Sequence, residues 1–105
     1  MIRTDYKENL AKYASSASDE ALQSIIRFCG IALKGQDSQF VSLTDDAEVM
    51  RVVNGFAAKK LGIDEAKTRA GLEVVHQKMA AENSKLRTTV YYLLAEATGT
   101  LSKLR

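Results

Sequence analysis

Apolar residues recur every three or four positions along most of the chain, in five stretches separated by short polar breaks. This spacing places the apolar side chains on one side of a helix, where they can pack against a core. The five predicted helices span residues 4–14, 18–34, 44–62, 64–82 and 83–99. The pattern therefore predicts an all-α fold, a compact array of about five helices with no sheet.

Capping residues mark several of the predicted helix ends. Thr4, Ser18 and Asp64 each precede a helical pattern, and side chains of these types accept hydrogen bonds from the first free backbone amides of a helix. Gly62 follows the third predicted helix, which fits a glycine at a helix C-terminus. Gly30 lies inside the second pattern, where it either permits a close helix crossing or divides the stretch into two pieces.

Two segments depart from the simple helical pattern. Residues 36–43 form the longest irregular stretch, and we expect Phe40, Val41 and Leu43 to reach the core from a loop or short turn. Residues 88–92 have the composition of a strand, but they lie within a longer period of 3.6 and are interpreted as helix.

The fourth and fifth predicted helices have more apolar surface than one core-facing stripe requires. The fourth has a main stripe of large residues and a second face of small ones, and two adjacent tyrosines widen the apolar surface of the fifth. Either a second copy of the chain covers this surface or a monomeric core absorbs it. The candidate interface residues are Ala66, Ala70, Val74, Tyr91 and Tyr92.

Length and composition agree with an ordinary globular chain. The 105 residues are expected to form a single helical domain, 1–105, with 46% apolar and 27% charged residues and no proline. A lone cysteine, an N-terminus without the apolar segment of a signal peptide and no apolar run of membrane-spanning length predict a cytoplasmic protein without a membrane partner.

Charge is distributed unevenly along the chain. Residues 1–50 contain five basic and eight acidic residues, net −3, whereas residues 51–105 contain ten and five, net +5. The two halves either complement each other in the folded chain or leave a basic face for an acidic partner or nucleic acid. Nucleic acid is the less favoured partner because acidic residues are interspersed. The candidate basic patch is Lys59, Lys60, Lys78, Lys85 and Arg87.

Few residues suggest catalysis. His76, the single histidine, would need an orienting carboxylate to act as a base, and Glu73 and Glu82 are near it in sequence. Cys29 lies on an apolar stripe and is interpreted as a small core residue. One histidine and one cysteine do not make a zinc site, and the glycines form no phosphate-binding loop. No catalytic, cofactor-binding or metal-binding residues are therefore predicted, and no cofactor.

Several segments resemble a small bacterial family known only as a domain of unknown function, DUF2853. They are the run from Lys85 to Glu96 (KLRTTVYYLLAE), the segment from Phe28 to Leu33 (FCGIAL), the Lys59–Gly62 segment (KKLG) and the opening Asp5-Tyr6. The resemblance covers essentially the whole chain. It implies an array of about five helices and a bacterial origin, and it implies no activity and no site residues.

The sequence therefore favours a non-enzymatic cytosolic helical interaction module that acts as a homodimer. Binding of nucleic acid or another acidic partner by the basic second half is the alternative. A small enzyme that uses His76, with Glu73 or Cys29, is a weaker alternative.

Overall fold

The helical periodicity predicts the elements that the structure contains. The computed structural model describes residues 4–30 and 39–104. Its elements in chain order are α1 (Thr4–Ala11), α2 (Asp19–Cys29), β1 (Phe40–Val41), α3 (Asp46–Val52), η2 (Val53–Leu61), α4 (Glu65–Lys78), β2 (Lys85–Leu86), α5 (Arg87–Ala97) and η3 (Leu101–Lys103). The expected all-α array is confirmed. The structure adds a pair of strands, β1 and β2, with two residues each.

Two of the three predicted capping residues, Ser18 and Asp64, cap their helices as expected. The Ser18 hydroxyl accepts a hydrogen bond from the amide of Ala21 at 3.1 Å, and the Asp64 carboxylate accepts one from Lys67 at 2.8 Å. At α3 the cap is Asp45, whose carboxylate accepts from the backbone amide two residues on. These side chains satisfy amides that have no partner within the helix.

Helix α2 is shorter than the predicted helix, which extended to residue 34. It ends at Cys29, and Gly30 follows with a φ of 49°, a conformation that residues with a β-carbon rarely adopt. Of the two readings of Gly30, the structure therefore supports a break in the helix. The remaining positions of the predicted helix, 31–34, lie outside the described residues.

The third predicted helix is two helical forms in series. α3 continues directly into η2, which is a π-helix with i→i+5 hydrogen bonds. Gly62 ends it in the left-handed conformation with a φ of 70°, and its amide bonds to the carbonyl of Ala57. Apolar periodicity places the helix correctly but does not distinguish the two hydrogen-bonding patterns.

A short antiparallel ribbon joins distant parts of the chain. Phe40 pairs with Leu86 and Val41 with Lys85, and the amide of Arg87 donates to the carbonyl of Gln39 at 2.7 Å. The fifth helix was expected from residue 83, but this pairing holds residues 85 and 86 extended. α5 therefore begins at Arg87.

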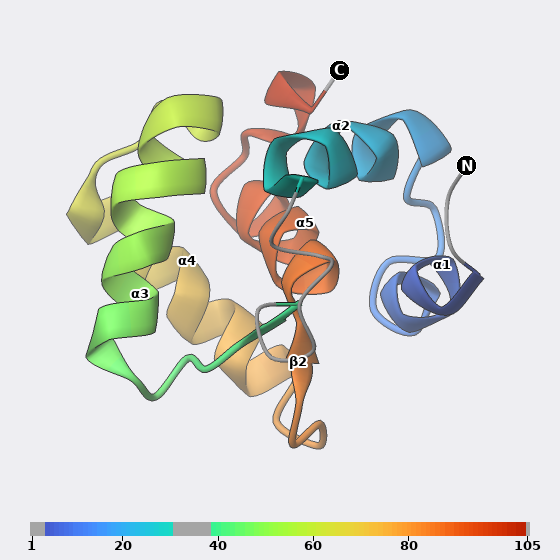
Figure 1. Ribbon diagram of the computed structural model, residues 1–105, viewed down its shortest axis with the longest axis horizontal. Coiled ribbons are helices and arrows are strands. Elements are labelled where there is room, and N and C mark those ends of the chain that lie inside the picture. The colour runs from blue at the N-terminus through green and yellow to red at the C-terminus, as the bar shows by residue number, and fades with distance from the viewer. Residues whose placement is uncertain (1–3, 31–38, 105) are drawn as a thin grey trace.

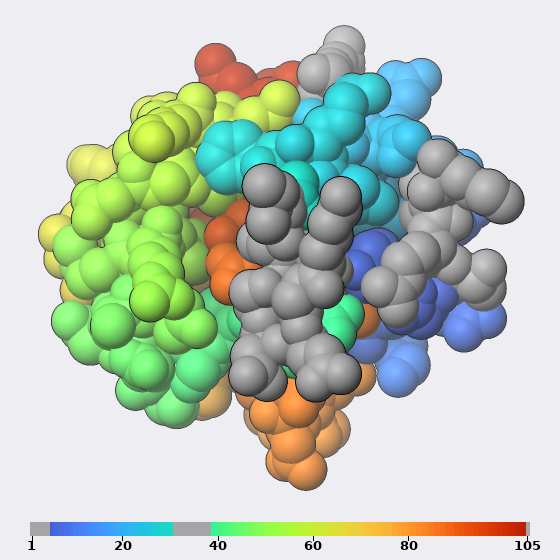
Figure 2. All heavy atoms as spheres, in the orientation of Figure 1, coloured from blue at the N-terminus to red at the C-terminus, as the bar shows by residue number. Residues whose placement is uncertain are grey.

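Helix α5 passes through the middle of the molecule. Figure 1 shows α2 above it, α1 to its right, the α3–η2 segment to its left and α4 behind it, and α5 makes direct contacts with α1, α2, α4 and both strands. In the space-filling view, α5 atoms reach the visible face only in a narrow gap (Figure 2). All nine residues from Arg87 to Ala95 are buried.

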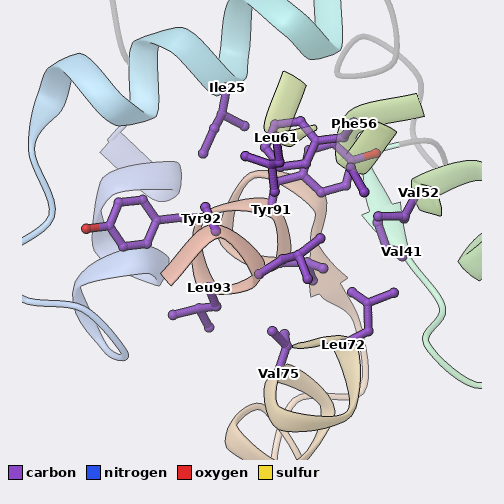
Figure 3. Packing of buried hydrophobic residues seen from close by; sticks show 14 of the residues in the cluster. Ile25, Val41, Val52, Phe56, Leu61, Leu72, Val75, Tyr91, Tyr92 and Leu93 are labelled. Atoms are coloured by element: carbon purple, nitrogen blue, oxygen red, sulfur yellow. The ribbon is translucent and has the colours of Figure 1, made fainter. Parts of the chain in front are cut away.

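Aromatic rings connect α5 to the helices on its left and above it. Phe56 of η2 stacks on Tyr91 with ring centroids 4.1 Å apart and an interplanar angle of 14°, and Phe28 meets Phe56 edge-on at 5.4 Å. Figure 3 shows Phe56 and Tyr91 side by side, with Leu72 and Val75 approaching from α4. The core is thus formed around α5 and contains buried side chains from the helices that surround it.

A polar network attaches α1 to α5 and to the turn after α4. The Asn9 side chain donates to Glu82 Oε1 at 3.0 Å and accepts a hydrogen bond from the Thr89 hydroxyl. Glu82 also pairs with Lys12 at 3.5 Å. These bonds satisfy partly buried polar groups and fix the position of the turn.

None of the helices described within residues 4–30 and 39–104 is both long enough and apolar enough to span a lipid bilayer.

Candidate functional site

Three of the five candidate interface residues lie on the solvent side of α4. Ala66, Ala70 and Val74 follow one another at intervals of four residues, so they form a row along one side of the helix. All three are exposed, and 53% of the Val74 surface is accessible. We call this row the α4 outer face. The opposite side of α4, with Leu72 and Val75, packs against the core.

The other two candidate interface residues lie inside the chain's own core. Tyr91 and Tyr92 are each 5% exposed. Tyr91 stacks on Phe56, and Figure 3 shows the Tyr92 ring directed away from this stack. The apolar surplus on α5 is therefore buried within one copy of the chain.

The candidate basic patch is not one surface. Lys59 and Lys60 lie at the end of η2, at the upper left of Figure 1, whereas Lys85 lies on β2 at the bottom. Lys78, at the end of α4, is paired with Glu96 of α5 at 3.2 Å. The structure therefore places Lys59 and Lys60 apart from Lys85, and it pairs Lys78 with an acidic residue.

Arg87 is a correction to the predicted patch, because it is buried at 7% exposure. One guanidinium nitrogen donates to the Tyr91 hydroxyl at 2.8 Å, and the other donates to the carbonyl of Phe40 at 3.4 Å. The guanidinium group thus lies inside the fold, and its hydrogen bond to Phe40 connects α5 to β1. Its place in a basic run of the sequence gave no sign of this.

Ion pairs join the acidic half of the chain to the basic half. Asp46 pairs with Arg69 at 3.2 Å, and Lys12 pairs with Glu82. Arg69 also donates to Glu65 at 2.8 Å, and these carboxylates raise the pKa of its guanidinium. The Asp46–Arg69 pair therefore compensates part of the charge asymmetry within the chain, whereas the Lys12–Glu82 pair joins the minority charges of the two halves.

Cys29 is half-buried at the end of α2 and packs against the core, as a small apolar residue would. Burial raises the pKa of its thiol to about 11, although the nearby charge of Arg87 acts in the opposite direction. Because the thiolate is the reactive form, Cys29 is a poor nucleophile at neutral pH.

His76 lies at the wall of a concave region. A hollow of about 240 Å³ is formed between the segment after β1, the start of α3, and the turn that leads into β2. We call it the His76 cleft. It is lined by Phe40, Val41, Ser42, Leu43, Thr44, Glu48, His76, Asn83, Ser84 and Lys85. The turn that provides the last three residues projects at the bottom of Figures 1 and 2.

His76 also lines a second hollow. It has a volume of about 180 Å³ and shares His76 and Leu43 with the His76 cleft. Arg69 and Glu73 line it as well. The single histidine therefore lines two depressions, a position that its sequence neighbours did not reveal.

The His76 ring has no orienting carboxylate. Nδ1 is buried and has no hydrogen-bond partner among the described residues. Glu73 lines the smaller hollow, but its carboxylate accepts a hydrogen bond from Gln77 at 3.2 Å. Glu82 is bound by Asn9 and Lys12. No hydrogen bond joins His76 to Cys29 in the described part of the chain.

Sequence reasoning missed most of the His76 cleft. Ser42 comes from the irregular segment, Thr44 was expected at the start of the third helix, and Asn83 and Ser84 were expected at the start of the fifth. The β1–β2 ribbon brings these two segments together, and two residues per strand are too few to produce an alternating pattern.

A third hollow, of about 390 Å³, lies near the C-terminal end. It is lined by Ser16, Ser18, Glu20, Ala21, Tyr92, Leu101, Ser102 and Leu104. Burial raises the pKa of the Tyr92 phenol, and the charge of Glu96 adds to this effect. Hydroxyl groups dominate this hollow, and Glu20 is its one charged lining residue in the described chain.

No group of three or more histidine, cysteine, aspartate or glutamate side chains is placed to hold a metal ion within residues 4–30 and 39–104.

Comparison with known proteins gives a family. The model of a family described as "Protein of unknown function (DUF2853)" matches residues 5–102, nearly the whole chain. No curated protein matches the chain significantly. The match confirms the resemblance seen in the sequence.

Proposed function

We propose that this chain, which belongs to the DUF2853 family, is a non-enzymatic cytosolic interaction module that forms a homodimer through the α4 outer face. The observation behind the proposal is the exposure of Val74, 53% accessible, in line with exposed Ala66 and Ala70. Within the described residues, Val74 and Phe28 are the large apolar side chains that solvent reaches most.

Small side chains suit this helix to close packing. Alanines add little bulk, so a second helix can approach at the short end of the usual 8–10 Å interaxial range. α4 has 14 residues and is about 21 Å long, enough for a contact over nearly four turns. Its length and its small exposed side chains therefore favour a helix–helix contact over a flat surface contact.

A two-fold arrangement follows from the positions of the three residues. Ala70 lies midway between Ala66 and Val74. In an antiparallel pair centred on Ala70, each Ala66 would meet the partner's Val74, so that the two-fold symmetry covers the exposed valine of both copies. Two-fold dimers are the commonest oligomers.

The test is the solution mass as a function of concentration. Light scattering and sedimentation equilibrium from micromolar to millimolar protein should show a species of about twice the 11.5 kDa chain mass at the upper end. Ala70→Glu should remove it, because two carboxylates would be buried at the contact.

Ala58→Glu is the matched control, because Ala58 is also an exposed alanine, on η2. It should leave the mass distribution as in the wild type. A wild-type chain that stays monomeric up to millimolar concentration, or an Ala58→Glu variant that dissociates as readily as Ala70→Glu, would refute the proposal.

A further inference from the structure

We propose that the His76 cleft is a binding site for a small monocarboxylate with a short hydrocarbon chain. This inference concerns residues other than the α4 outer face and does not depend on dimer formation. It rests on the size of the cleft, the unpartnered Nδ1 atom of His76, the position of Lys85 and the apolar wall beside them.

The size of the cleft limits the ligand. A volume of about 240 Å³ corresponds to roughly eight water molecules at about 30 Å³ each, and it lies below the usual range for drug-sized ligands. The cleft therefore accommodates a molecule of fewer than about ten heavy atoms, and it is too small for a nucleotide.

His76 provides a hydrogen-bond donor. A proton on its buried Nδ1 would have no acceptor among the described residues, so the neutral ring is better stabilised with the proton on Nε2. Nδ1 is enclosed and His76 lines the cleft, so the proposal assigns the ring edge with Nε2 to the ligand. An N–H at this position suits an acceptor such as a carboxylate oxygen.

Lys85 provides the positive charge. Its ammonium group donates to the carbonyl of Glu82 at 2.9 Å, which holds it on the turn and leaves its other two N–H groups for further acceptors. Asn83 and Ser84 add an amide and a hydroxyl to the same rim. A carboxylate has two oxygens and can accept from His76 and from this rim together.

Glu48 restricts the charge of the ligand. It lines the cleft and pairs with Arg51 at 3.1 Å, so its negative charge is only partly compensated. A single negative charge is tolerated beside it better than the double charge of a phosphate. Phe40, Val41 and Leu43 form the remaining wall and suit a hydrocarbon chain.

The test is a titration of the full chain, followed by ¹H–¹⁵N correlation spectra, with butyrate as the probe and butyramide as its uncharged counterpart. Butyrate should shift the amide signals of residues 42–44 and 83–85 saturably, and butyramide should bind at least tenfold more weakly. From acetate to butyrate, each methylene should strengthen binding up to about fourfold. Long-range ¹H–¹⁵N spectra should show the His76 proton on Nε2.

Variants separate the two contacts. His76→Phe and Lys85→Met should each weaken butyrate binding at least tenfold, whereas His76→Gln, which keeps an N–H donor, should lose less than His76→Phe. Lys59→Met, at an exposed lysine on η2, is the control and should bind like the wild type. If His76→Phe fails to fold, Lys85→Met with its control decides the result.

Three outcomes would overturn the proposal: equal shifts with butyramide, shifts that do not saturate, or binding that survives both His76→Phe and Lys85→Met. Tighter binding of inorganic phosphate than of butyrate would overturn the assigned ligand class. The monomeric Ala70→Glu variant should bind butyrate normally, so a failure of the dimer proposal is distinguishable from a failure of this one.

Discussion

Helices α4 and α5 were both expected to have more apolar surface than one core-facing stripe requires, but they lie in different environments in the structure. α5 is surrounded by other elements, and its residues from Arg87 to Ala95 are buried whether they are leucine, threonine or arginine. α4 buries one side, and alanines and a valine remain exposed on the other. An apolar surface around a helix thus indicates burial when the side chains are large, and it is a weak indicator when they are mostly alanine.

An arginine on each helix shows the same difference in environment. Arg87 of α5 is enclosed and donates to Tyr91 and to the carbonyl of Phe40. Arg69 of α4 lies at the surface between two carboxylates. The formal charge is the same, but one arginine completes the core and the other forms surface ion pairs, so their removal should have different consequences.

The largest expected difference between the helices concerns apolar truncation. Leu94→Ala in α5 should lower the free energy of unfolding by about 2–5 kcal/mol, because Leu94 is fully buried. Val74→Ala in α4 should change it by less than about 0.5 kcal/mol. Urea unfolding followed by circular dichroism, at a concentration where the chain is monomeric, measures both. Equal losses would contradict the division between a central and an outer helix.

Removal of the two arginines should give the next largest difference. Arg87→Met should cost about 2–3 kcal/mol, because the Tyr91 hydroxyl and the Phe40 carbonyl lose a charged donor inside the fold. Arg69→Met should leave the urea midpoint close to that of the wild type, because solvent screens exposed ion pairs. A wild-type midpoint for Arg87→Met would show that the buried hydrogen bonds contribute nothing to stability.

Glycine-to-alanine substitutions test where α4 meets α5. At Gly71 a new β-carbon would lie 2.7 Å from Leu94 Cδ1 and 2.8 Å from Thr98 Cγ2. The overpacking should exceed the gain in helix propensity and leave a net loss of about 1 kcal/mol.

Gly55 in η2 provides the matched control, since a β-carbon there meets open space. Gly55→Ala should gain up to about 1 kcal/mol, because alanine restricts the unfolded chain. Thermal unfolding of both variants shows whether each substitution lowers or raises the stability. A stabilised Gly71→Ala protein would show that α4 and α5 can separate at little cost.

The smallest effect is expected from the Cys29 thiol on α2, because its ionisation changes stability only above about pH 9. Its pKa is raised from 9.0 to about 11, so the folded chain binds this proton more tightly than the unfolded chain. The resulting contribution to stability is present below pH 9 and is lost as the pH rises towards 11. At pH 8, alkylation by iodoacetamide should be about 100-fold slower in the folded chain than in urea, one factor of ten per pKa unit.

Mass spectrometry of the alkylated fraction over time gives this ratio. A folded-state rate within threefold of the unfolded rate would show that burial does not protect the thiol.

Local sequence signals determined the helices and several of their boundaries. Ser18 and Asp64 begin α2 and α4 because their side chains accept hydrogen bonds from nearby amides, an interaction that involves only neighbouring residues. The family was also recognisable, because its characteristic segments are contiguous in the chain. Periodicity fixed which residues share a helix side, since that follows from the geometry of a single helix.

Only the tertiary structure decided which helix is central, where Arg87 points and which segments form the His76 cleft. Each depends on residues far apart in sequence: Phe40 pairs with Leu86 across the ribbon, and His76 meets residues of both strand-flanking segments. Burial and pocket formation are properties of several elements packed together. The pattern within one element contains no information on its neighbours.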